Sequence, residues 1–269
     1  MSVPPGPSDR PVPSGLPLRS GRSAWSTWFR CTKTRPFARV RLFCFPYAGG
    51  SAALYHNWHQ GLPPAVEVRA VQYPGRADRM AEPLVGDAGR MAELITEAMG
   101  PLLDRPAALF GHSMGALLAY EVTRALRDLG TPPVHLFVSG RRAPHLPARE
   151  AAVADADDAT FMSQLSSLGG TDADMLADPQ IRELTFPYLR NDFRLVETYV
   201  HREAAPLDVP VTALAGDADP TATPDEAAGW SETTTGAFTA RVLPGDHFYL
   251  VPRQDDVLAE ITAGLDPYL

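Results

Sequence analysis

The feature that most constrains the fold is a repeated alternation between short apolar runs and longer helical stretches. From residue 40 onward, short runs rich in Val, Leu and Phe recur, and several of them lack the polar alternation of a half-exposed strand, which is typical of strands covered on both faces. This order predicts a mostly parallel central sheet with flanking crossover helices, the arrangement of an α/β protein. The predicted strands are 40–45, 66–72, 107–110, 134–139, 211–215 and 240–243, and the predicted helices are 86–103, 114–129, 223–231 and 255–265.

The composition fits a cytoplasmic protein and argues against several partners. The 269 residues are 45% hydrophobic, enough for a sizeable core, and they carry a formal net charge of -8. That charge argues against nucleic-acid binding and against broad contact with anionic membranes, because both need a basic surface. Only two cysteines occur, no apolar stretch reaches the length of a membrane span, and the N-terminus lacks the pattern of a signal peptide.

Two segments depart from the alternating pattern. Residues 1–22 are rich in Pro, Ser, Gly and Arg with little to bury, which predicts a disordered extension before a single domain at 23–269. Residues 142–206 contain helical patches but no predicted strand, and the stretch is too long for a plain crossover. We expect an inserted helical lid there, with a flexible interruption at 169–174. A longer crossover of ordinary packing helices is the alternative.

A serine stands at G-x-S-x-G spacing where a predicted strand meets a predicted helix. Gly111, Ser113 and Gly115 follow the apolar run 107–110 and lead into the helix that begins at Met114. A nucleophile elbow turns so tightly that side chains beside the serine would clash, which explains the two glycines. The motif also occurs by chance, but this placement is the context that an elbow needs. We therefore predict Ser113 as a nucleophile, with a glycine-rich packing turn as the alternative.

A serine nucleophile also needs hydrogen-bond donors for the oxyanion that forms when it attacks a carbonyl. The backbone N–H of Met114, at the N-terminus of the following helix, is the natural first donor. The loop after the first strand, FPYAGGS at 45–51, holds small residues whose backbone can approach closely. We expect Ala48 N–H to be the second donor, with Tyr47 as the alternative. The loop lacks the glycine pattern and the lysine of nucleotide-binding loops.

An acid and a base are expected after later strands, in the order Ser, Asp, His. Asp219 lies in the sequence GDADP after the strand at 211–215, and Asp217 in the same loop is the alternative. His247 follows the strand at 240–243, after a Gly-Asp turn from which its side chain could reach back over the sheet edge. We predict His247 as the general base and Asp219 as the carboxylate that orients it.

Three other histidines are weaker candidates. His112 adjoins the nucleophile in sequence, so it would point into the structure or line the pocket rather than complete a triad. His56 and His59 lie three residues apart, but no third ligand and no H-E-x-x-H pattern accompanies them. We expect both to be surface or packing residues, and we predict no metal and no cofactor.

These motifs resemble those of type II thioesterases, the stand-alone editing enzymes of polyketide synthase and nonribosomal peptide synthetase systems, which have the α/β-hydrolase fold. The resemblance runs from about residue 28 to the C-terminus. It is carried by RLFCFPYAGGSAALYHNW, VEVRAVQYPGRADRMAEP, LFGHSMGALLAYEV, LRNDFRLVETY, ALAGDADP and LPGDHFYL. Tyr47 stands where the family usually has histidine. QYPGR, at 72–76, is a mark of the family for which the sequence suggests no chemical role.

The resemblance implies roles for the predicted site. Ser113, Asp219 and His247 match the family's catalytic triad, and Ala48 and Met114 match its oxyanion-hole backbone positions. It implies hydrolysis of stalled or wrongly loaded acyl groups held on the phosphopantetheine arm of acyl carrier proteins, with no metal or cofactor. The segment predicted as a lid would set acyl-chain length and access to the site.

The implied partners are acyl carrier protein domains and their acyl thioesters, with no nucleic acid and no membrane. Carrier proteins in such systems are typically acidic, and this chain is acidic overall, so docking would need a local basic or apolar surface. Arg190 and Arg194 are candidates for that surface, and plain surface arginines are the alternative. The rival functions are a carboxylesterase or lipase of the same fold, a non-catalytic scaffold, and a chain-terminating cyclase.

Overall fold

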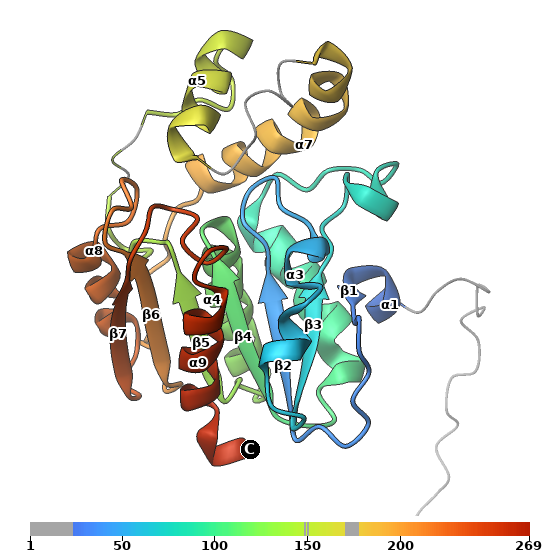
Figure 1. The fold of residues 1–269 in the computed structure, drawn as a ribbon, viewed down its shortest axis with the longest axis vertical. Coiled ribbons are helices and arrows are strands. Elements are labelled where there is room, and N and C mark those ends of the chain that lie inside the picture. The colour runs from blue at the N-terminus through green and yellow to red at the C-terminus, as the bar shows by residue number, and fades with distance from the viewer. Residues whose placement is uncertain (1–23, 148, 150, 170–177) are drawn as a thin grey trace, which may run out of the picture.

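One sheet of seven strands organises the computed structural model, which describes residues 24–147, 149, 151–169 and 178–269. The strand order is β1-β3-β2-β4-β5-β6-β7, and all neighbouring strands are parallel except β1 and β3 (Figure 1). This arrangement confirms the predicted α/β class. The strands are β1 (Phe29–Arg30), β2 (Val40–Phe45), β3 (Val66–Val71), β4 (Ala107–His112), β5 (His135–Ser139), β6 (Val211–Gly216) and β7 (Phe238–Leu243).

Helices cover both faces of this sheet, as strands buried on both sides require. On one face pack α1 (Ala24–Trp28), α3 (Ala88–Met99) and α4 (Met114–Asp128). On the other face pack α2 (Trp58–Gly61) and α9 (Gln254–Gly264), and α8 (Pro224–Ala228) follows β6. Short 3₁₀ helices connect or extend these elements: η1 (Ala52–Tyr55), η2 (Ala77–Arg79), η3 (Gly100–Leu102), η4 (Gly229–Thr233) and η5 (Asp266–Tyr268).

The predicted strands and helices agree with the structure apart from their ends, and the strand predicted at 40–45 matches β2 residue for residue. The helix predicted at 86–103 is split into α3 and η3, with Pro101 in the first turn of the second. The strand predicted at 107–110 continues to His112, because β4 stays paired with β5 up to Ser139. The sequence did not predict α1 or β1. The extension predicted at 1–22 lies outside the described residues, and so does the predicted interruption at 169–174 apart from its first residue.

Between β5 and β6, the described residues form helices and no strand. We call α5 (Asp158–Leu168) and α7 (Pro179–Glu197) the cap helices. They lie together beyond one edge of the sheet, at the top of Figure 1. A small apolar cluster of their own, including Phe161 and Leu189, packs them against each other. In the described ranges, no helix is both long enough and apolar enough to cross a membrane.

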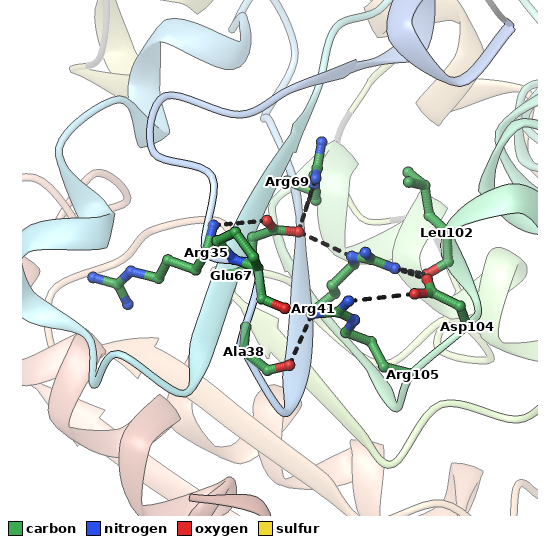
Figure 2. Close-up of polar contacts among 9 residues, drawn as sticks. Arg35, Ala38, Arg41, Glu67, Arg69, Leu102, Asp104 and Arg105 are labelled. Carbon is green, nitrogen blue, oxygen red and sulfur yellow. Dashed lines mark hydrogen bonds and ion pairs between the residues drawn. The ribbon is translucent and has the colours of Figure 1, made fainter.

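A buried charged cluster joins the amino ends of β2 and β3 (Figure 2). The Glu67 carboxylate accepts hydrogen bonds from Arg35 N at 2.9 Å, from Arg41 Nε at 2.9 Å and from Arg69 Nη2 at 2.8 Å. Arg41 also donates to Leu102 O at 2.6 Å, which ties the strands to the segment before β4. Because it lies at the amino ends of the strands, this cluster is far from the loops that follow them and serves the fold.

Acidification is expected to weaken this cluster. Burial raises the pKa of Glu67, but the hydrogen bonds from Arg35, Arg41 and Arg69 outweigh burial and leave that pKa below its ordinary value of 4.5. A carboxyl group with a lowered pKa stabilises the folded state at higher pH and loses this contribution as the pH falls through the folded-state value. We therefore expect the free energy of unfolding to fall as the pH drops below about 4.5, and to fall less steeply in Glu67→Gln. Urea denaturation across the acid range measures both, and identical pH profiles would contradict the expectation.

Candidate active site

Ser113 lies in the sharp turn between β4 and α4. Its backbone has φ 55° and ψ −117°, a conformation that residues with a Cβ rarely adopt. Ser113 N donates a hydrogen bond of 2.8 Å to Ser139 O at the end of β5, which holds the turn against the sheet. Because α4 begins at Met114, its unpaired first amides and the positive end of its dipole lie directly behind the serine.

Close backbone contacts explain the two glycines of the motif. A Cβ on Gly111 would lie 2.1 Å from Gly115 O, and a Cβ on Gly115 would lie 2.0 Å from Phe45 O and 2.7 Å from Pro46 O. The neighbouring atoms all belong to the backbone, so they cannot turn aside as the end of a flexible side chain can. The loop after β2 therefore packs directly on the turn that carries Ser113.

Replacing Gly115 by alanine is expected to destabilise the fold by about 3 kcal/mol, because the methyl group overpacks a rigid backbone contact. Gly100→Ala is the matched control, since a Cβ there would meet nothing within 4 Å. Urea denaturation of the two variants measures the difference. If both were as stable as the parent, the loop after β2 would be able to move away from the turn at little cost.

His247 and Asp219, which follow different strands, are brought into contact. His247 Nδ1 lies 2.9 Å from Asp219 Oδ2, and both side chains are almost completely buried. Burial raises the pKa of Asp219, but hydrogen bonds from His247 and Thr221 outweigh it and leave that pKa below its ordinary value. Asp219 is therefore ionised near neutral pH. An ionised acceptor at this distance assigns the proton of the neutral imidazole to Nδ1, which leaves Nε2 unprotonated and able to act as a base.

Thr221 completes this arrangement, and the sequence did not point to it. Its backbone N donates to Asp219 Oδ1 at 2.8 Å and its hydroxyl donates to the same oxygen at 2.9 Å. Thr221 Oγ1 also lies 2.9 Å from His247 Nδ1. Asp219 therefore has both oxygens engaged and a fixed orientation. The only available signal in the sequence is a threonine two residues after an aspartate, the spacing at which an aspartate side chain commonly accepts a backbone N–H.

Asp217, the alternative carboxylate, is placed elsewhere. Its Oδ1 accepts a hydrogen bond of 2.8 Å from Gly245 N, so it joins the loops that follow β6 and β7 from an exposed position. In the structure, Asp219 therefore contacts the His247 side chain, whereas Asp217 accepts a backbone hydrogen bond from the loop that carries His247.

The three weaker histidine candidates have structural contacts. His112 is fully buried with Nδ1 2.8 Å from Ser139 Oγ, and its ring centroid lies 5.1 Å from that of His247. Burial lowers the pKa of His112 well below its ordinary value, so this ring is neutral. His56 is exposed and His59 half-buried, and His59 Nδ1 is 2.9 Å from His56 O.

A cavity of about 210 Å³ lies between the turn at Ser113 and the cap helices. Ser113, His247, Tyr47 and Ala48 line it, whereas Asp219 does not. The Tyr47 ring packs edge-on against Phe248, with centroids 4.9 Å apart, so this side chain forms part of the wall. The cap helices contribute Gln164, Leu165, Leu168, Phe193, Val196 and Glu197. The predicted nucleophile, the predicted base and the predicted oxyanion loop therefore meet at one cavity.

The two arginines suggested for docking lie on α7. Arg190 Nη1 donates to Ala154 O and to Ala156 O, each at 2.7 Å, and its guanidinium lies 4.4 Å from the centroid of the Phe161 ring. Arg194 pairs with an exposed aspartate of the segment before α5. Because these contacts are internal to the region of the cap helices, the structure favours the alternative of arginines that serve their own segment.

Comparison with known proteins places the chain among a consistent set of relatives. The family model described as Thioesterase domain matches residues 40–265. Thioesterase PikA5 of Streptomyces venezuelae is 41% identical over 259 residues, which cover 95% of this chain and 88% of that relative. A probable cadicidin biosynthesis thioesterase of Streptomyces griseus is 41% identical over 251 residues, which cover 93% of this chain and 69% of that relative. The solved structure of the type II thioesterase BorB from the borrelidin biosynthetic cluster superposes with a TM-score of 0.82 at 39% identity, over 89% of this chain and 98% of that one.

Proposed function

The chain belongs to the thioesterase domain family, and on that basis we propose that it removes stalled or wrongly loaded acyl groups from the carrier proteins of a polyketide synthase or nonribosomal peptide synthetase. The family, the α/β-hydrolase fold and the thioester-hydrolase class predicted from the sequence are confirmed by these relatives. The carboxylesterase or lipase alternative is not favoured. The single observation that carries the proposed chemistry is the meeting of Ser113, His247 and the loop around Ala48 at one cavity.

In the proposed mechanism, Ser113 Oγ attacks the thioester carbonyl while His247 Nε2 takes the hydroxyl proton. Asp219 stabilises the imidazolium that forms and keeps the ring oriented. The backbone N–H groups of Met114 and Ala48 stabilise the oxyanion. Collapse of this intermediate breaks the C–S bond, and the thiol leaves with the proton from His247. The same histidine then takes a proton from water, whose oxygen attacks the acyl-serine; the ester bond to Ser113 Oγ breaks, Oγ takes the proton back from His247, and the free acid leaves.

In this proposal, the substrate binds in the cavity that the cap helices help to line. A phosphopantetheine arm reaching from a carrier protein would enter between them and the sheet edge, with the acyl group in the cavity lined by side chains such as Leu165 and Val196. In this proposal the segment 142–206 acts as a lid that sets acyl-chain length and access. The reaction would take place in the cytoplasm, and it calls for no cofactor.

The test compares thioesters with oxygen esters of the same acyl group. Acyl-pantetheine and acyl-carrier substrates of several chain lengths are offered alongside the matched oxygen esters, and kcat/KM is measured for each. We expect the thioesters to be preferred, and mass spectrometry of the peptide containing Ser113 to show a transient acyl adduct. A preference for the oxygen esters would instead favour the carboxylesterase alternative.

A further inference from the structure

A buried ion pair joins the cap helices to the QYPGR motif. Arg76, the last residue of that motif, and Asp192 on α7 have side chains that are 3% and 0% exposed. Arg76 Nη2 donates to Asp192 Oδ1 at 2.7 Å, and Arg76 Nη1 donates to Asp192 Oδ2. The guanidinium also lies 4.9 Å from the ring centroid of Tyr188, one turn earlier on α7. Neither charged side chain lines the cavity, so neither is placed to touch the substrate.

The same carboxylate holds the loop after β2. Gly49 N donates to Asp192 Oδ2 at 2.8 Å, and Arg76 Nη1 donates to Gly50 O at 3.3 Å. Gly49 has φ +80°, and a Cβ there would lie 2.4 Å from Leu189 Cδ2 on α7. The peptide that follows Ala48 is therefore fixed from the cap side by a hydrogen bond and by direct packing.

Stability alone does not account for a charged pair at this place. Two charges lose their hydration when they are buried, and well-packed apolar residues of similar volume often stabilise a fold equally well. What apolar residues cannot do is accept the hydrogen bond from Gly49 N. An oxyanion donor contributes to catalysis when its orientation is set before the reaction, and a misplacement of about 1 Å can cost about 100-fold in rate.

We propose that Asp192, itself held by Arg76, is a positioning residue that orients the Ala48 N–H toward the oxyanion. This proposal rests on the proposed function, in which Ala48 supplies one of the two oxyanion donors. It gives the QYPGR motif a role, because Arg76 neutralises and aims the carboxylate that holds the loop. It also makes the oxyanion site depend on the position of α7, since a displaced cap would take the acceptor away from Gly49 N.

The experiment compares two double variants that both lack the ion pair. Arg76→Met/Asp192→Asn keeps a carbonyl oxygen that can accept from Gly49 N, whereas Arg76→Met/Asp192→Leu does not. Removing both charges together avoids leaving one of them buried and unpaired, which would endanger folding. Circular dichroism and thermal melting set a temperature at which both variants are folded. Steady-state kinetics with an acyl-pantetheine substrate are then combined with amide hydrogen exchange of the full chain labelled with ¹⁵N-glycine.

We expect kcat of the Asp192→Leu double variant to be at least about 10-fold below that of the Asp192→Asn double variant, with similar KM, and exchange at Gly49 to be faster in the Leu variant. Equal kcat and equal exchange in the two variants would overturn the proposal, and so would a loss confined to KM. The exchange measurement does not depend on activity. Failure of the proposed function would instead appear as the absence of Ser113-dependent thioester hydrolysis in the parent protein.

Discussion

Replacing Ser113 by alanine is expected to lower kcat for thioester hydrolysis by about five to six orders of magnitude, because no other group can then form the acyl-enzyme. The stability of the fold should change little. Alanine has a Cβ as serine does, so the unusual backbone conformation at φ 55° is no more strained after the substitution. Single-turnover hydrolysis of an acyl-carrier substrate measures the rate, and mass spectrometry reports whether an acyl adduct forms.

The matched control for this experiment is Ser163→Ala, which removes an exposed serine from α5. We expect it to hydrolyse the substrate at a rate close to that of the parent protein. If hydrolysis continued in Ser113→Ala at a rate close to that of the parent, the nucleophile would lie outside the turn between β4 and α4. The proposed mechanism would then be wrong.

The second large effect is expected at Asp219. An asparagine there offers no negative charge to the imidazolium, and its amide N–H₂ can donate to Nδ1 and favour the wrong tautomer of His247. By analogy with the loss of this carboxylate in other serine hydrolases, Asp219→Asn should lower kcat by about 10⁴-fold. Thr221 would remain beside the histidine but, being neutral, could not stabilise its positive charge.

Asp217→Asn is the control for this variant, because the two aspartates lie in the same loop. The asparagine retains an oxygen that can accept the hydrogen bond from Gly245 N. We therefore expect the kinetics of Asp217→Asn to stay close to those of the parent. If the two variants lost activity equally, the loss would reflect the loop as a whole rather than the contact between Asp219 and His247.

The parts of the fold that could be predicted are those with a local signal. Runs such as VRLFCF at Val40–Phe45 show no regular alternation of polar and apolar residues, because both faces of β2 are covered. β1 is different, since a strand of two residues has no periodicity, and its antiparallel pairing of Phe29 with Val71 is a tertiary contact.

In the candidate site, too, some contacts could be predicted from the sequence and others depend on the tertiary structure. The order of Ser113, Asp219 and His247 along the chain, each after a strand, was enough to propose their proximity. The sequence favoured Asp219 over Asp217 in the same short turn, and the structure places Asp219 beside the histidine through a contact across 28 residues. Arg76 and Asp192 are 116 residues apart, and their pairing depends on where α7 lies over the sheet.

The location of the cap helices has a consequence for how substrate range could diverge among relatives. They occupy one contiguous stretch between β5 and β6, whereas Ser113 and the pair Asp219–His247 belong to loops of the sheet. Recombination of a single gene segment could therefore exchange the part of the cavity wall that the cap helices contribute and leave Ser113, Asp219 and His247 in place. Such a chimaera would have one requirement: the exchanged segment must supply a carboxylate that pairs with Arg76, as Asp192 does here. Natural or engineered exchanges that lack it should yield folded but slow enzymes.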